Sequence, residues 1–120
     1  MDRIRFEDYK GKKVLIEDFS QMRPGPEFLA QIATAQKVIA SQPQKSVLAV
    51  LDATGASFNN EILAAMKDFT KANTPYVKAA AVTGINGLLQ VALSSISKFS
   101  GRSFNAFPTR EAALDWLVQQ

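Results

Sequence analysis

The run SVLAVLD at residues 46–52 constrains the fold more than any other part of the sequence. It stays apolar and rich in valine and leucine until it ends in Asp52, a pattern typical of a strand that is covered on both faces. Small polar residues follow, and apolar residues then recur at helical spacing from about Phe58. A strand, a turn and a helix in this order indicate an α/β fold built on a parallel sheet.

Strands and helices alternate along the rest of the chain. Two strands at 3–9 and 13–19, separated by the turn signal Lys10-Gly11, predict an antiparallel hairpin. Further strands are predicted at 76–82 and 103–107, and helices from Pro26 to the stop signal at 41–43 and at 58–72, 86–97 and 110–118. The order β-β-α-β-α-β-α-β-α predicts one α/β domain over residues 1–120, with a mostly parallel mixed sheet, an N-terminal hairpin and four helices.

The composition excludes several classes of chemistry. The chain of 120 residues contains no cysteine and no histidine, which excludes a disulfide framework, thiol chemistry and histidine-dependent catalysis. No metal or cofactor site is predicted. The 14 basic and 11 acidic residues give a net charge of +3 and are scattered along the chain, so no nucleic-acid partner is predicted.

The length and composition of the apolar segments predict where the protein is located in the cell. Residues 1–13 have no apolar core and do not resemble a secretory signal. The most apolar stretch, at 79–93, is interrupted by polar residues and is shorter than the ~20 apolar residues of a membrane-spanning helix. We therefore expect no membrane span and a cytoplasmic protein.

Two polar segments, at 52–60 and 83–87, follow predicted parallel strands, whose carboxyl ends gather at one rim of a sheet. The candidate residues for binding a partner or ligand there are Asp52, Thr54, Gly55, Ser57, Asn59, Asn60, Thr83, Gly84 and Asn86. A structural interpretation stays open for each of them, because Ser57 or Asn59 can cap the following helix and Thr54-Gly55 can serve the turn alone. The second segment lacks the spacing and the lysine of a phosphate-binding loop.

No catalytic set assembles from these residues. Ser57 has no histidine to act as its base, and Asp52 with Glu61 is the only nearby carboxylate pair, with nothing in the sequence to fix its geometry. The chain is not predicted to be an enzyme.

The helix predicted at 86–97 carries more apolar residues than one sheet-packed stripe needs. These are Leu88, Leu89, Val91, Ala92, Leu93 and Ile96, with Phe99, Phe104 and Phe107 soon after. Three interpretations stay open. The surplus packs on a second subunit, or it lines a lipid-sized pocket, or the C-terminal helix covers it with Ala113, Leu114, Leu117 and Trp116.

Two motifs carry a resemblance to a known family. LDATGASF at 51–58 follows the strand end and small-residue turn of anti-sigma-factor antagonists, and KAAAVTGINGLL at 78–89 is followed by Gly101-Arg102, Phe107, Thr109 and the helix start REAALDWL at 110–117. Together they resemble the STAS domain superfamily, in particular its SpoIIAA-like branch, also described as STAS/SEC14-like. Where the antagonists carry Asp-Ser-Ser, this chain reads Asn60-Glu61-Ile62, so Ile62 stands in place of the phosphorylated serine.

The resemblance implies a non-enzymatic signalling or regulatory module that binds a protein partner through the 52–60 loop and the helix after it. Thr54 or Ser57 could be modified there, since a phosphate at a helix N-terminus is stabilised and alters partner contacts. The alternative, implied by the SEC14-like comparison, is a carrier of a lipid or small apolar ligand beside the 86–97 helix. A homodimer is compatible with either.

Overall fold

The computed structural model describes residues 2–84, 86–100 and 104–120, and its third helix has described side chains at 90, 91 and 93–97. The strands are β1 (Ile4–Tyr9), β2 (Lys12–Asp18), β3 (Val47–Asp52), β4 (Val77–Thr83) and β5 (Asn105–Phe107). The helices are α1 (Pro26–Ala40), α2 (Asn60–Asn73), α3 (Gly87–Ser100) and α4 (Arg110–Leu117). The element order is the predicted one.

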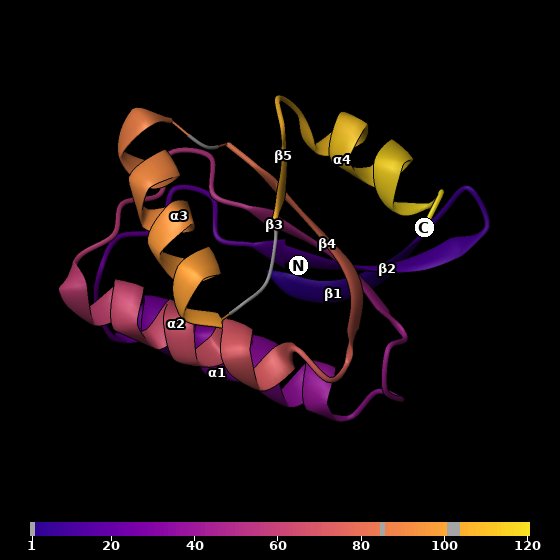
Figure 1. The fold of residues 1–120 in the computed structure, drawn as a ribbon, viewed down its shortest axis with the longest axis horizontal. Coiled ribbons are helices and arrows are strands. Elements are labelled where there is room, and N and C mark those ends of the chain that lie inside the picture. The colour runs from indigo at the N-terminus through magenta and orange to yellow at the C-terminus, as the bar shows by residue number, and fades with distance from the viewer. Residues whose placement is uncertain (1, 85, 101–103) are drawn as a thin grey trace.

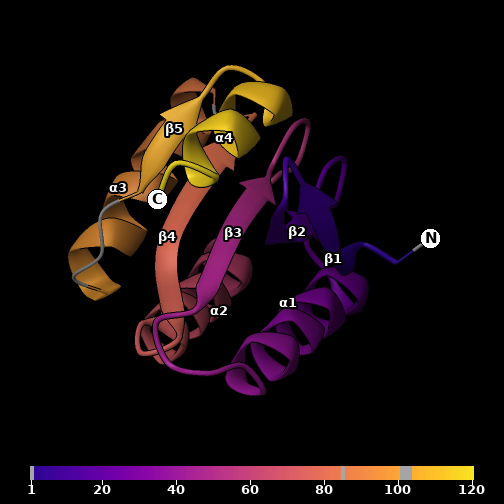
Figure 2. The same cartoon turned by 90° about the vertical axis from the view of Figure 1, so that its right-hand side faces the viewer.

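Figure 1 shows the arrangement of these elements, and the five strands form one sheet in the order β1-β2-β3-β4-β5 (Figure 2). β1 pairs antiparallel with β2, and every later pair is parallel. The prediction of a mostly parallel mixed sheet with an N-terminal hairpin is confirmed, and the hairpin places β1 at the edge of the sheet. Two neighbouring parallel strands need a crossover connection between them, usually a helix. The alternation of apolar runs with helical segments in the sequence therefore predicts parallel pairing.

Helices cover both faces of the sheet, so its central strands are buried on both sides. α1 and α2 pack against each other beneath one face, and α3 packs on α2, whereas α4 lies on the opposite face against β3, β4 and β5 (Figure 2). The first core contains Leu15, Phe19, Phe28, Ile32, Ala35, Ile39, Ile62, Met66, Phe69 and Ile96 among others, and the second contains Val14, Ile16, Leu48, Val50, Ala81, Ala113 and Leu117. Alternate residues of β2 and β3 therefore enter different cores.

Local side-chain chemistry fixes where the helices begin. Asn59 caps α2, accepting a hydrogen bond from the Ile62 N–H at 2.9 Å, so Ser57 is not the cap. The predicted start at Phe58 is two residues early, because the cap residue itself is not helical. Thr109 caps α4 as predicted and accepts from the Ala112 N–H at 3.1 Å.

The position of α4 corrects one interpretation of the sequence. Ala113 and Leu117 are fully buried against the second core, on the face of the sheet opposite α3. Trp116 packs on the same side, with its ring centroid 5.5 Å from that of Phe107. The interpretation that α4 covers the apolar surplus of α3 is therefore wrong, since the chain leaves β5 toward the other face. The side chains of Leu88, Leu89, Ala92 and Phe99, and the motif residues Gly101 and Arg102, lie outside what the structure describes.

Candidate functional site

The carboxyl ends of β2, β3 and β4 lie next to one another at one rim of the sheet. Asp18 is the register partner of Asp52, and Asp52 is that of Thr83. Beyond the strands, the Ala53 N–H donates to the Thr83 carbonyl oxygen at 2.9 Å. The two polar junctions predicted to meet, one after β3 and one after β4, are thus in direct contact.

A third loop, residues 19–25 after β2, belongs to the same rim, and sequence reasoning missed it. The Gln21 N–H donates to the Thr54 carbonyl oxygen at 2.8 Å, and the Ser57 N–H donates to the Met22 carbonyl oxygen at 3.0 Å. The sequence did contain a signal for this loop. If the strand predicted at 13–19 is parallel to β3, it must end at the same rim as β3.

Asp52 is a buried and fully engaged carboxylate. Its residue is 8% exposed. Oδ1 accepts hydrogen bonds from the Thr54 N–H at 3.0 Å and the Thr54 hydroxyl at 2.6 Å. Oδ2 accepts two from the Arg110 guanidinium, from Nη2 at 2.7 Å and from Nε at 3.2 Å. All of these donors belong to the protein: Thr54 is in the loop after β3 and Arg110 is in α4. Asp52 therefore holds this loop and α4 in place.

Asp18 repeats this arrangement one strand away. Its Oδ1 accepts from the Ser20 N–H at 3.0 Å and the Ser20 hydroxyl at 2.5 Å, as Asp52 does from Thr54. Arg110 Nη2 lies 3.6 Å from its Oδ2, and Arg3 Nη1 lies 3.7 Å from its Oδ1. Two aspartates and two arginines thus form a neutral network at the rim. Of these four residues, only Asp52 was singled out from the sequence, together with its hydrogen-bond donor Thr54.

The network holds both aspartates ionised. Burial alone would raise the pKa of Asp52, but the hydrogen bonds from Thr54 and Arg110 outweigh it and hold the pKa below its ordinary value of 3.8. The pKa of Asp18 is lowered in the same way: burial opposes, and Ser20 with the charges of Arg110 and Arg3 outweighs it. Burial acts to lower the pKa of Arg110, but the two carboxylates raise it overall.

These lowered pKa values predict acid sensitivity. A carboxyl with a lower pKa in the folded state contributes stability that is present above its unfolded pKa and is lost as the pH falls through its folded pKa. We expect the free energy of unfolding to fall as the pH drops below about 4, and Asp52→Asn to make this fall shallower. Urea titrations at pH 7, 4 and 3 measure it, with Asp8→Asn in β1 as a control for the lost charge. An unchanged slope in Asp52→Asn would contradict this role of Asp52.

A groove of about 610 Å³ opens beside the rim, between the 52–59 loop, the start of α2 and α3. Its lining contains Gly55, Ser57, Asn59, Asn60 and Asn86 among the predicted residues. It also contains Arg23, Leu63, Val91 and Ser95, which sequence reasoning did not assign to the site. Asp52, Thr54, Thr83 and Gly84 do not line it and form the support behind it. We call this cavity the rim groove.

The two candidate modification residues have different surroundings. Thr54 is exposed, and its hydroxyl donates to Asp52. Ser57 is half-buried, lines the rim groove and accepts a hydrogen bond from Arg23 Nη1 at 3.3 Å. Ile62, which stands in place of the antagonists' phosphorylated serine, is fully buried. Its side chain belongs to the core rather than to a surface that a kinase could reach.

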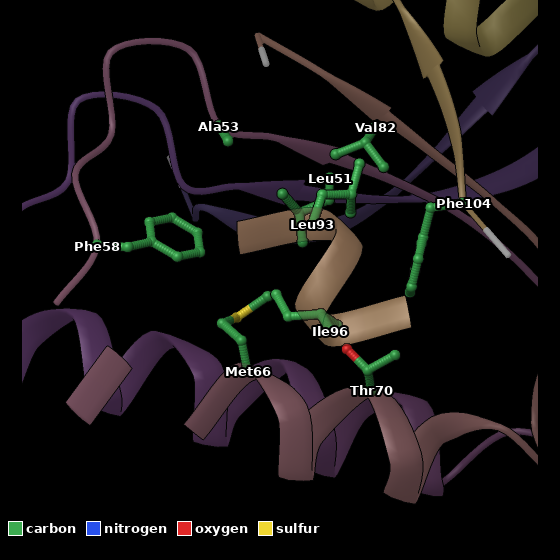
Figure 3. A pocket seen from close by; sticks show the side chains of 9 residues that line it. All are labelled: Leu51, Ala53, Phe58, Met66, Thr70, Val82, Leu93, Ile96 and Phe104. Atoms are coloured by element: carbon green, nitrogen blue, oxygen red, sulfur yellow. The ribbon is translucent and has the colours of Figure 1, made fainter. Parts of the chain in front are cut away.

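An apolar cavity lies under α3, where a lipid-sized pocket was one prediction (Figure 3). Its lining comes from β3, β4, α2, α3, the loop before α2 and the residue before β5, and consists of Leu51, Ala53, Phe58, Met66, Thr70, Val82, Leu93, Ile96 and Phe104. Its volume is about 30 Å³, and a cavity needs about 10–15 Å³ to hold one water molecule. An acyl chain therefore needs α3 to move before it can enter.

The described part of the chain offers neither a metal site nor a membrane-spanning helix. It contains no group of three or more carboxylate, histidine or cysteine side chains placed to hold a metal ion. None of its helices has the length and apolar character required to cross a bilayer.

Comparison with a solved structure defines the class of the fold, which is α/β and SpoIIAA-like. The chain is similar to the crystal structure of an uncharacterized protein of the DUF3478 family from Shewanella loihica PV-4, described as having that fold, with a TM-score of 0.73 and 20% sequence identity. The match covers 95% of this chain and 91% of that chain. No protein-family model matches the sequence, and no curated protein matches it. The fold predicted from the two motifs is confirmed.

Proposed function

We propose that this chain is a non-enzymatic regulatory module of the cytoplasm that binds a protein partner through the rim groove. The observation that carries the proposal is the groove itself. Its volume of about 610 Å³ lies within the range of about 300–1,000 Å³ of pockets that hold a small molecule, and is therefore large enough for a few side chains of a partner. Val91 on its α3 wall is 71% exposed, the largest exposure of a large apolar side chain in the described residues.

The chemistry of the rim supports binding rather than catalysis. The sequence contains no histidine or cysteine. Asp52 is neutralised by Arg110 and its lone pairs are engaged, so it is a poor general base. The Ser57 hydroxyl oxygen accepts from an arginine, whereas activation as a nucleophile requires a base to take its proton.

Modification at the rim would give such a module two states. A phosphate on Thr54 would remove the hydroxyl donor to Asp52 and place a charge of about −2 next to a carboxylate, which would loosen the loop. A phosphate on Ser57 would instead gain an ion pair with Arg23 and fill the groove. Intact-mass analysis of the protein isolated from its own cells tests this. A single unmodified mass under all growth conditions would rule the switch out.

Site-specific photocrosslinking tests the proposed surface. We expect a photoreactive amino acid at Asn60, in the groove, to give a discrete protein adduct in the cells that make this protein. The same group at Gln36, exposed on α1, serves as the control and should give none. Adducts at Gln36 and not at Asn60 would place the partner elsewhere.

Val91→Asp is expected to weaken partner binding at least tenfold. Because Val91 is 71% exposed, the change should alter the free energy of unfolding by no more than about 0.5 kcal/mol. Titration calorimetry with the crosslinked partner measures the effect, and Ala33→Asp on the exposed face of α1 is the matched control. Equal affinities for the two variants would contradict the proposal.

The second candidate function is a carrier of a lipid or small apolar ligand, which would use the apolar cavity under α3 after α3 has moved. Native mass spectrometry after gentle purification separates the two functions, since a carrier retains a ligand and an interaction module does not. A homodimer through α3 fits either function, and light scattering measures it.

A further inference from the structure

We propose that the partner segment which enters the rim groove carries a carboxylate next to an apolar side chain, the carboxylate binding Arg23 and the apolar group lying against Val91 and Leu63. This inference rests on the function proposed above and specifies the chemistry of the partner.

The first observation is the charge of the groove. Among the lining residues that the structure describes, Arg23 is the one cation and none is a carboxylate. The α3 wall contributes none, because the sequence of α3, GLLQVALSSISKFS, has no acidic residue. A negatively charged group would therefore meet the attraction of Arg23 and no carboxylate among the described lining residues.

The second observation is that Arg23 differs from the other described arginines. Arg3, Arg5 and Arg110 each pair with a carboxylate of this chain, at 3.7, 2.5 and 2.7 Å. Arg23 has no such carboxylate among the residues that the structure describes, and its Nη1 makes one 3.3 Å hydrogen bond to Ser57. An exposed guanidinium keeps several N–H donors in a fork that matches a carboxylate.

The third observation is the apolar part of the same groove. Val91 is 71% exposed, and Phe58 and Leu63 are half-buried beside it. Asn59 uses its side-chain oxygen to cap α2, which leaves its amide N–H groups as donors. The groove thus offers donors, one positive charge and an apolar floor, which is the complement of an acidic peptide with an apolar anchor.

A polyanion such as a nucleic acid fits less well. Its binding depends on several cations that neutralise successive phosphates, and the described lining of the groove supplies one. A single carboxylate beside an apolar side chain matches the one arginine and the apolar residues of the described lining.

Selection from a random 12-residue peptide display library tests the inference. We expect the peptides selected by the wild-type protein to place Asp or Glu next to an aliphatic or aromatic residue. In fluorescence anisotropy, their affinity should fall at least tenfold with Arg23→Glu and less than twofold with Lys37→Glu, an equal charge change at the far end of α1. Arg23→Gln, which removes the charge without reversing it, should give an intermediate loss.

Amide chemical-shift mapping of the selected peptides distinguishes the two levels of failure. Peptides that bind in the groove without acidic residues, or without sensitivity to Arg23→Glu, would overturn the charge preference and leave the proposed function standing. If no peptide is selected, or if the shifts lie outside the groove, both are overturned. The variants and the wild type should unfold at the same urea concentration. A loss of affinity then cannot be attributed to a loss of folding.

Discussion

Gly84→Ala is expected to lower the free energy of unfolding by about 3 kcal/mol. Gly84 has a φ of +81°, and a Cβ built on it would lie 2.3 Å from the backbone nitrogen of Thr54. The substitution therefore adds a left-handed backbone penalty of about 1 kcal/mol to a clash with main chain, which cannot turn away as a flexible side chain could. Urea unfolding followed by circular dichroism measures the loss.

Gly11→Ala is the matched control. Gly11 has nearly the same φ, +84°, but a Cβ there would meet nothing within 4 Å. Its cost should be the backbone penalty alone, about 1 kcal/mol. The difference between the two variants isolates the contact between the β4 junction and the β3 junction. Equal costs would mean that these junctions do not touch.

Arg110→Ala is expected to lower the free energy of unfolding by about 2 kcal/mol at pH 7. Removal of the guanidinium takes two hydrogen bonds from Asp52, whose side chain is 11% exposed, and leaves that charge with Thr54 as its donor. This expected loss of unfolding free energy is smaller than for a fully buried ion pair. The Arg110 side chain is 32% exposed, so solvent screens its interaction with Asp52.

The position of Arg110 sharpens this test. It is the first residue of α4, where a cation is disfavoured by the helix dipole and alanine is the better helix former. If Arg110 had no carboxylate partner, its replacement by alanine should stabilise α4 slightly. A double-mutant cycle with Asp52→Asn should recover about 1–2 kcal/mol of coupling, and Lys37→Ala should cost less than about 0.5 kcal/mol. Zero coupling would contradict the role given to the network.

The fold could be predicted because the necessary signals are local. The apolar run 46–52, the turn at Lys10-Gly11 and the cap at Thr109 each encode an element within a few residues. The parallel arrangement followed from their order. The meeting of the two polar junctions followed in turn, since parallel strands end at the same rim.

The partners across the rim could not be predicted, because they are far apart in the sequence. Arg110 lies 58 positions from Asp52, and Arg23 lies 34 positions from Ser57. Only the strand order and the face covered by α4 bring these residues together. One sequence signal was available: Asp18 and Asp52 each precede a hydroxyl residue by two positions at the end of an apolar strand, a spacing that favours the same turn.

The surplus of apolar residues on α3 shows the same limit. Periodicity identified the helix, but it could not say which neighbour covers each side. α4 lies across the sheet, Ile96 enters the first core, and Val91 remains exposed at the groove. The exposed side chain became a candidate contact only when its neighbours in space were known.

The central claim is that the rim groove, rather than the sheet edge or the α4 face, receives a protein partner. Amide chemical-shift mapping of the labelled chain at saturation with the partner recovered by crosslinking tests it most directly. The account predicts that the largest shifts cluster at Arg23, at 55–60 and along α3, with β1 and α4 unchanged. Shifts concentrated on β1 or α4, with the groove amides unmoved, would contradict it.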